Sequence, residues 1–116
     1  MKSIILAAAI VLFSVPAFAK TETASWYGQH WAGRHTANGE RFNPRAFTAA
    51  SKTLPMGTKL LISRGHRHVI VRINDRGPYV RGRGLDLSQA AASKLNMIHH
   101  GVAKVQYTVL KPKKHH

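Results

Sequence analysis

Residues 69–88 read VIVRINDRGPYVRGRGLDLS, and this stretch carries the clearest structural signal in the chain. Apolar residues alternate from Val69 to Ile73, which predicts a strand with one buried face. Residues 74–78 then supply turn chemistry, because glycine permits unusual backbone dihedral angles and proline fixes φ. Asp75 and Asp86 lie beside this loop and are two of only four acidic residues in a chain with 18 lysines and arginines. A role for these two carboxylates is therefore the first question.

Short strands are predicted elsewhere by the same kind of pattern. In residues 105–109, Val105, Tyr107 and Val109 alternate with polar side chains, which again indicates one buried face. Shorter strand candidates cover residues 24–27, 47–50 and 59–62. Strands this short are more stable in a closed arrangement than with open edges. The sequence therefore predicts a mainly β, barrel-like domain.

One helix is predicted from Ser88 to Leu95, where residues 89–92 are mostly good helix formers. Either Asp86 or Ser88 is placed to accept hydrogen bonds from the first free amides of this helix. No internal repeat or low-complexity linker indicates a second domain.

The N-terminus has the pattern of a secretory signal peptide. Residues 1–19 contain a basic start, an apolar run and small residues before an expected cleavage site after Ala19. The alternative is a membrane anchor, but the apolar run, residues 4–15, is shorter than the roughly 20 residues that span a bilayer. No cysteine follows the run, so we expect no lipid anchor. We expect residues 20–116 to form one exported domain, with a core from about 24 to 110, in the periplasm or outside the cell.

The formal net charge of +14 predicts binding to polyanions of any sequence. The alternative is that the charge only keeps the protein soluble. Outside the inner membrane the abundant anionic polymers belong to the cell wall, so nucleic acid is not the expected partner. The chain has no cysteine, which excludes disulfides and a thiolate nucleophile. We expect a monomer without a cofactor and without stable membrane insertion.

Several short motifs occur in a fixed order along the chain. They are ASWYG at 24–28, TANGERF at 36–42, TAASKTLPMG at 48–57, VRINDRGPY at 71–79 and LDLS at 85–88. Any one of them is a weak signal, whereas the ordered set is specific. Through these motifs residues 24–110 strongly resemble the catalytic domain of the rare lipoprotein A (RlpA) family, which are septal lytic transglycosylases of bacterial cell walls.

The resemblance implies both a fold and a reaction. The fold is a six-stranded double-psi β-barrel with one or two short helices. The reaction cleaves peptidoglycan glycan strands between N-acetylmuramic acid and N-acetylglucosamine without water. The muramyl 6-hydroxyl attacks its own anomeric carbon and leaves a 1,6-anhydro end. Such cleavage needs a proton for the leaving oxygen and stabilisation of an oxocarbenium-like centre.

The catalytic candidates are the acidic residues that match the family motifs. Asp75 matches the Asp that the family uses in catalysis; its alternative role is a turn aspartate that binds its own backbone. Asp86 matches a second family Asp, with a helix cap as the alternative. Glu40 matches a residue that lines the same groove, with a surface turn as the alternative. Glu22 matches nothing. Which carboxylate is the acid stays open.

Ser51 departs from the family pattern. Active members have a histidine here, paired with the catalytic Asp, and serine has no group that titrates near neutral pH. Ser51 can still donate a hydrogen bond to Asp75 or to a sugar hydroxyl. A further hypothesis is that His30 or His35, from a neighbouring loop, replaces the missing imidazole; the alternative is that both are solvated loop residues.

Substrate-binding candidates are aromatic and arginine side chains near these motifs. Aromatic rings offer flat faces for sugars, and arginines near the acidic pair can bind lactyl or peptide carboxylates. The candidates are Trp26, Tyr27, Trp31, Arg76, Tyr79 and Arg83, with Arg81 as a further arginine. Core packing is the alternative for one of Trp26 and Tyr27, and solvated loop charge is the alternative for the arginines.

Two other functions compete with the enzyme. Ser51 favours a weakly catalytic or non-catalytic wall-binding module comparable to expansins. The eight histidines raise the possibility of metal binding, since His66 and His68 share a face of a predicted strand. Without cysteine or a His-Glu-x-x-His spacing this signal is weak, and we expect no metal site.

Overall fold

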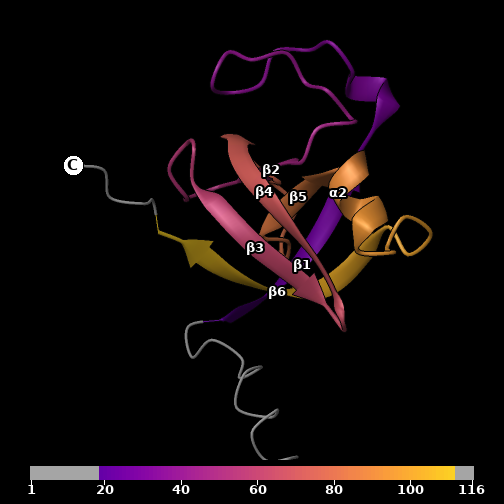
Figure 1. Cartoon of the computed structure of the whole chain (residues 1–116). Helices are drawn as coiled ribbons and strands as arrows, with labels where there is room; N and C mark the ends of the chain where they lie inside the picture. The colour runs from indigo at the N-terminus through magenta and orange to yellow at the C-terminus, as the bar shows by residue number, and fades with distance from the viewer. Residues whose placement is uncertain (1–18, 112–116) are drawn as a thin grey trace, which may run out of the picture.

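The computed structural model describes residues 19–111 (Figure 1). The predicted signal peptide, apart from Ala19, lies outside the described residues. The strands are β1 (Lys20–Tyr27), β2 (Thr48–Ser51), β3 (Lys59–Arg64), β4 (Arg67–Asp75), β5 (Leu85–Ser88) and β6 (Val102–Leu110). The helical segments are a 3₁₀ turn, η1 (Gln29–Trp31), and the helix α2 (Gln89–Lys94). No helix in the described range is both long and apolar enough to cross a bilayer.

The strands form a closed barrel in the order β1-β5-β2-β4-β3-β6. β1 pairs with β5, and β2 with β4, in parallel, whereas the other neighbouring pairs are antiparallel. This is a double-psi β-barrel, as the resemblance implied. β5 was not among the strands predicted from alternation, because it is only four residues long and obtains its partners from distant parts of the chain.

The barrel interior is filled by apolar side chains that alternate along the strands. The alternation predicted for residues 69–73 is confirmed, since Val69, Val71 and Ile73 are at most 3% exposed and Ile70 is 51% exposed. In β6 the prediction is wrong at one end, because Val109 is 45% exposed. The pairing of β6 with β1 stops at Tyr107, so beyond this point β3 is the only strand partner of β6 among the described residues.

The helix α2 packs against β1, β4 and β5 and inserts two buried alanines into the core (Figure 1). Its N-cap is Ser88, whose Oγ accepts a hydrogen bond from the Ala91 amide at 3.2 Å. The structure thus selects Ser88 over Asp86 as the cap, and Asp86 is free for another role. A serine cap of this kind contributes about 1 kcal/mol to stability.

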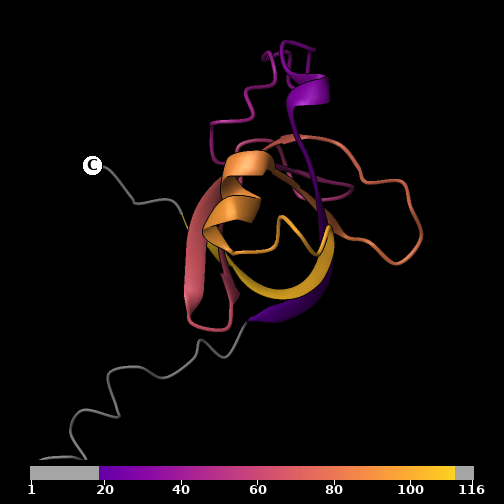
Figure 2. The same cartoon turned by 90° about the vertical axis from the view of Figure 1, so that its right-hand side faces the viewer.

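Two loops extend from the barrel on the side that carries the candidate site. The segment 28–47, which contains η1, rises above the barrel, and the segment 76–84 between β4 and β5 extends sideways (Figures 1 and 2). The upper loop is fastened to β4 by a hydrogen bond from the Asn38 amide to the Asn74 carbonyl (3.2 Å). Both loops therefore start from strands that carry candidate residues.

Candidate active site

Asp75 and Asp86 lie in one row across neighbouring strands. Asp86 on β5 pairs with Ser25 on β1 and with Ala50 on β2. Ala50 pairs on its other side with Asp75 on β4. The residues before and after Asp86 are buried leucines, so Asp86 itself lies on the outer face of the barrel.

A β-bulge brings Asp75 to this face. Between β2 and β4, Ala49 pairs with Ile73, but the next residue, Ala50, pairs with Asp75, which makes Asn74 the extra residue. Ile73 is completely buried, so strict alternation would direct Asp75 into the barrel as well. The bulge shifts the alternation by one residue and turns Asp75 outward.

The row of aspartates forms part of the wall of an open cavity of about 420 Å³. Its lining residues are Ser25, Trp26, Tyr27, Trp31, Ala50, Asp75, Arg76, Gly77, Pro78, Tyr79, Val80, Arg83 and Asp86. We call this cavity the aspartate groove. Both candidate aspartates contribute to it, as do all six of the first-named substrate-binding candidates, Trp26, Tyr27, Trp31, Arg76, Tyr79 and Arg83, whereas Glu40, Ser51 and Arg81 do not.

Asp75 is held by backbone amides. Its Oδ1 accepts hydrogen bonds from the amides of Ala37 and Arg76, each at 2.9 Å. Charge-assisted bonds of this kind suit a carboxylate oxygen that carries negative charge. The Arg76 bond is the local turn contact that the sequence offered as an alternative, but the Ala37 bond reaches Asp75 from the loop 28–47. The site therefore depends on where that loop lies.

Asp86 has different surroundings from Asp75. Burial raises the pKa of Asp86, and this effect outweighs the Ser25 hydroxyl and the Arg83 charge, which lower it, while the Asp75 charge raises it further. The Ser25 Oγ donates to Asp86 Oδ1 at 2.8 Å. Asp86 is thus the carboxyl of the pair that keeps its proton to higher pH than an ordinary aspartic acid.

Tyr27 contributes a buried hydroxyl near both aspartates. Burial first, and then the charges of Asp75 and Asp86, raise the pKa of Tyr27, so its hydroxyl stays protonated. In the part of the chain that the structure describes, this hydroxyl lies close enough to Asp75 for that carboxyl to add to the raised pKa, but it makes no hydrogen bond of normal geometry. Its ring stacks on Phe42 with 4.4 Å between the centroids, which leaves the hydroxyl as the functional part of the side chain.

The two tryptophans have different environments. Trp26 packs against the core and its Nε1 donates to the Ile98 carbonyl at 3.3 Å, as expected for a packing residue. Trp31 is 43% exposed, and the Arg34 guanidinium lies 5.0 Å from the centroid of its ring. Tyr79 is 79% exposed. Trp31 and Tyr79 are therefore the aromatic faces that the groove presents to solvent.

The arginines near the acidic pair also differ in role. Arg76 Nη1 donates to the carbonyls of Ser51 (3.1 Å) and Leu54 (2.7 Å), so its head group fastens the end of β2. Arg83 is close enough to Asp86 to lower the pKa of that carboxyl. Among the described residues, no backbone carbonyl accepts a hydrogen bond from the Arg83 side chain. Of these two arginines, Arg83 is therefore the one whose charge is directed at the acidic pair.

Glu40 is an ion-pair residue on the loop 28–47. It accepts two hydrogen bonds from the Arg72 guanidinium (2.8 and 3.1 Å) and one from Asn74 Nδ2 (3.0 Å). The bonds from Arg72, then Asn74 and Asn38, lower the pKa of Glu40 to about 2, against a smaller opposing effect of burial. A carboxylate with this pKa is ionised at neutral pH and is not a proton donor there, which favours a structural role.

Of the two hydrogen bonds that the sequence allowed for Ser51, to Asp75 or to a sugar hydroxyl, the structure does not contain the one to Asp75. The Ser51 Oγ accepts from the amides of Thr53 (3.3 Å) and Leu54 (3.1 Å), and among residues 19–111 no hydrogen bond joins it to Asp75. The physical reason is alternation, because Ala50 lies on the groove side of β2 and the next side chain faces away. Ser51 instead lines a second cavity.

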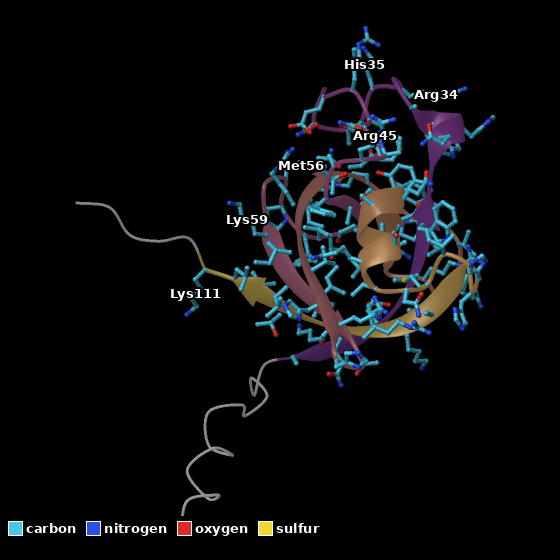
Figure 3. All side chains as sticks on the ribbon, turned by 45° about the vertical axis from the view of Figure 1, so that its right-hand side comes forward. Arg34, His35, Arg45, Met56, Lys59 and Lys111 are labelled. Atoms are coloured by element: carbon cyan, nitrogen blue, oxygen red, sulfur yellow. The ribbon has the colours of Figure 1, made fainter. Side chains whose placement is uncertain are left out.

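Neither candidate histidine replaces an imidazole in the aspartate groove. His30 and His35 are exposed, and neither lines the groove. His30 contacts the edge of Trp31, with 5.5 Å between the ring centroids. His35 lies at the outer end of the loop 28–47, far above the barrel (Figure 3). Both histidines are therefore solvated loop residues, which was the alternative given for them.

The sequence reasoning missed three groups of the site: Ser25, Ala50 and the Ala37 amide. Ser25 and Ala50 lie inside quoted motifs, but their function comes from the pairing of β5 between β1 and β2. The Ala37 amide is a backbone group, so no residue type marks it. Strand pairing is the information that would have found them.

The fold and the groove define a double-psi β-barrel protein with two aspartates on its outer face. The chain belongs to the family described as lytic transglycolase, whose model matches residues 19–107. It is 56% identical over 91 residues to a probable endolytic peptidoglycan transglycosylase RlpA of Nostoc sp. and 51% identical over 89 residues to the endolytic peptidoglycan transglycosylase RlpA of Campylobacter jejuni. Each match covers 75% of this chain but only 24% and 32% of those relatives, respectively.

Solved structures agree on the fold. A Streptomyces papain inhibitor superposes with a TM-score of 0.67 at 22% identity, covering 82% of this chain and 96% of that one. An expansin of Clavibacter michiganensis superposes with a TM-score of 0.67 at 18% identity, covering 84% of this chain and 53% of that one. At these identities the likeness concerns the barrel alone.

Proposed function

We propose that the chain is an endolytic peptidoglycan lytic transglycosylase, which cleaves glycan strands between N-acetylmuramic acid and N-acetylglucosamine to 1,6-anhydro ends in cell-wall organisation. Family membership and the activity in the names of the relatives support the class of reaction. The observation that carries the proposal is the pair Asp75 and Asp86, which face one groove, with Asp75 held by two backbone amides and the pKa of Asp86 raised by burial. A pair of carboxyl groups in different surroundings is typical of glycan-cleaving sites.

Asp86 is the acid in this proposal. In its protonated form it gives a proton to the glycosidic oxygen as the bond from that oxygen to the muramyl anomeric carbon breaks. The resulting carboxylate then takes the proton of the muramyl 6-hydroxyl while that oxygen bonds to the anomeric carbon. The proton returns to Asp86, no water is consumed, and the product is a 1,6-anhydro sugar. The raised pKa of Asp86 supports this assignment, because an acid must hold its proton at the working pH.

Asp75 and Tyr27 complete the chemistry. Asp75, whose oxygen is oriented by the amides of Ala37 and Arg76, provides the negative charge that stabilises the oxocarbenium-like centre. The Tyr27 hydroxyl is a neutral donor beside both carboxyl groups and has an unused hydrogen-bonding capacity. Trp31 and Tyr79 supply exposed ring faces for the sugars, and Arg83 supplies positive charge for a lactyl or peptide carboxylate.

The test is product analysis on purified sacculi, both intact and stripped of peptides. The wild-type protein is expected to release anhydro-ended fragments that are identified by mass spectrometry. Asp86→Asn should lower the rate by about 10²–10⁴, the usual value of a proton-transfer group, and Asp75→Asn should lower it as well by removing the charge that stabilises the oxocarbenium-like centre. Anhydro products that form equally well with both asparagine variants would overturn the assignment.

The second candidate is a non-catalytic or weakly catalytic wall-binding module comparable to expansins. The observation that favours it is Ser51, which stands where active members of the family have histidine and whose Oγ binds backbone amides instead of Asp75. A transglycosylase and a wall-binding module are both expected to bind sacculi, but only the transglycosylase releases anhydro-ended fragments. Sacculus binding without any anhydro product would favour the module.

The proposed setting is the cell wall after export, with signal-peptide cleavage near Ala19. We propose that the protein acts as a monomer; one chain supplies both aspartates and the exposed aromatic rings of the groove, so the proposed chemistry needs no residue from a second copy. The charge of +14 supports electrostatic attraction to an anionic wall polymer. Binding to sacculi that is insensitive to salt would contradict this attraction.

A further inference from the structure

A cavity of about 360 Å³ lies across β1, β6 and β3, on the other side of the barrel from the aspartate groove. We call it the β3–β6 cavity; its lining residues are Thr21, Ser63, Arg64, Gly65, Lys104, Val105 and Gln106. Lys104 and Gln106 flank the buried Val105, so their side chains point outward. In the closed ring of six strands β3 stands opposite β5, and β6 opposite β2. The β3–β6 cavity and the groove therefore face in opposite directions.

Two cations, Arg64 and Lys104, line the β3–β6 cavity together with neutral hydrogen-bonding side chains and no carboxylate. Arg64 Nη1 donates to the carbonyls of Leu95 (3.1 Å) and Asn96 (3.0 Å), which fastens the end of β3 to the end of α2. Among residues 19–111, Nε and Nη2 of Arg64 donate to no acceptor. An oxyanion in the cavity can therefore accept hydrogen bonds from these two nitrogens and from the Lys104 ammonium group.

The β3–β4 hairpin adds basic side chains beside the cavity. Arg67 pairs directly with Arg64 in the strand register, and His68 pairs with Ser63. His66 lies in the turn between the two strands. Like charges directly opposite each other on paired strands repel and reduce stability. A bound anion would offset the repulsion between Arg64 and Arg67, so this pair indicates a site for negative charge.

No acidic side chain balances these charges. Residues 41–74 and 87–116, which include all of β3, α2 and β6, contain no Asp or Glu. β1 carries Glu22, but its carboxyl lies beside Gly84 in the second cavity, the one that Ser51 lines. Lys94, in the last turn of α2, adds an exposed cation next to the carbonyls that hold Arg64. We define the basic face as Arg64, His66, Arg67, His68, Lys94 and Lys104; within the described chain none of them forms an ion pair.

The basic face suits a surface of many phosphates better than a sugar polymer. Its four lysines and arginines come from β3, β4, α2 and β6, and clusters of this size bind anionic bilayers. The β3–β6 cavity has no aromatic lining residue, whereas the aspartate groove offers Trp31 and Tyr79. The hairpin lies at the end of the barrel away from the loop 28–47 (Figures 1 and 2). A flat surface can therefore meet the basic face without contacting that loop.

We propose that the basic face binds the surface of a bilayer that contains anionic phospholipids, with the phosphate of one headgroup in the β3–β6 cavity. Arg64 and Lys104 donate hydrogen bonds to that phosphate, and the other members of the basic face contact neighbouring headgroups. The contact is peripheral and involves no segment that crosses the bilayer. It directs the aspartate groove away from the lipid. This binding goes beyond the proposed function and does not depend on it.

The experiment measures cosedimentation of the full chain with two kinds of vesicle at physiological ionic strength. One kind contains phosphatidylcholine alone, and the other an equimolar mixture with phosphatidylglycerol. Wild type should bind the mixed vesicles more than about tenfold more tightly. Arg67→Gln and Lys104→Gln should each weaken this binding about fivefold, the value of one basic side chain near an anionic surface. All proteins carry the same N-terminus, so any contribution of residues 1–19 is common to them.

Lys59→Gln is the matched control, because it removes the same charge from an exposed position at the other end of β3 (Figure 3). Five residue steps along a strand place it about 17 Å from Arg64, farther than the Debye length of about 8 Å. It should bind the mixed vesicles as wild type does. Equal binding of wild type to both kinds of vesicle, or an equal loss in all three variants, would overturn the basic face as a binding surface.

A soluble glycerol-phosphate polymer distinguishes a bilayer from another source of phosphate. It should displace wild type from the mixed vesicles less effectively than added mixed vesicles of the same phosphate content do. Displacement that is equally strong would overturn the bilayer as the partner.

Trp31 reports the orientation of the bound protein. It is 43% exposed in the aspartate groove, whereas the other tryptophan, Trp26, packs against the core. Acrylamide quenching of the tryptophan fluorescence should therefore stay the same when the protein binds mixed vesicles. Loss of quenching would show that the groove faces the lipid and would overturn the orientation. None of these measurements uses a glycan, so a protein that binds mixed vesicles but releases no anhydro products would overturn the transglycosylase activity alone.

Discussion

Replacing Glu40 by glutamine separates a structural from a catalytic role for this residue. Glutamine keeps the shape of the side chain and an oxygen for Asn74, but it removes the charge that pairs with Arg72. A pKa lowered from 4.5 to about 2 corresponds to at most about 3 kcal/mol of stability at pH 7. Both side chains of the pair are 39% exposed, and solvent screening reduces this to about 1 kcal/mol.

The sign of the pH dependence follows from the direction of the pKa change. Because the pKa of Glu40 is lower in the folded chain than in the unfolded one, its contribution is complete above about pH 4.5 and is lost as the pH falls toward about 2. Wild type should therefore exceed Glu40→Gln in stability at pH 7 and approach it near pH 2. In thermal unfolding, about 1 kcal/mol corresponds to about 4–8 °C for a domain of this size.

The assay is thermal unfolding by circular dichroism from pH 7 to pH 2, together with release of anhydro products. A double-mutant cycle with Arg72→Gln isolates the pair energy from other effects of each change. Activity should fall modestly, through the loop that carries the Ala37 amide. Equal stability of wild type and Glu40→Gln at pH 7, or a loss of about 10² or more in rate without loss of stability, would refute the structural role.

Three further changes test other parts of the site. Ser25→Ala removes a donor that lowers the pKa of Asp86, so the pKa should rise further and the alkaline limb of the pH–rate profile should move to higher pH; no movement would contradict Asp86 as the acid. Tyr27→Phe removes a buried hydroxyl without a partner in the described chain, so in urea unfolding it should be at least as stable as wild type while its activity falls; full activity would show that the hydroxyl is not used. Ser88→Ala should lower the free energy of unfolding by about 1 kcal/mol through loss of the helix cap, whereas an unchanged value would argue against that cap.

The sequence predicted the parts of the fold that depend on local pattern. Alternation located β4, and the motifs identified the barrel and both aspartates. Alternation could not predict that the Asp75 side chain lies on the outer face of the barrel, because the bulge at Asn74 arises from pairing between β2 and β4. The order of the strands is equally non-local, which is why β5 was not predicted as a strand.

Residue roles were harder to predict than residue positions. Asp75, Glu40 and Ser51 all lie in family motifs, yet only Asp75 lines the groove. Glu40 is committed to Arg72, a partner 32 positions away in the sequence, and Ser51 to the amides of its own turn. A motif indicates that a residue is present, whereas the direction of its side chain depends on the strand register.

The position of Ala50 between Asp75 and Asp86 sets the distance between the backbones of the two aspartates. Ala50 pairs with Asp86 on one side and Asp75 on the other, so the two aspartates stand two strand spacings apart, about 10 Å between their backbones. That separation is set by backbone hydrogen bonds and not by side-chain length, and Ala50 lines the groove between the acids with no more than a methyl group. A designer who wished to bring the acids closer would have to change the order of strands, whereas one who wished to block the reaction would need only a larger residue at position 50.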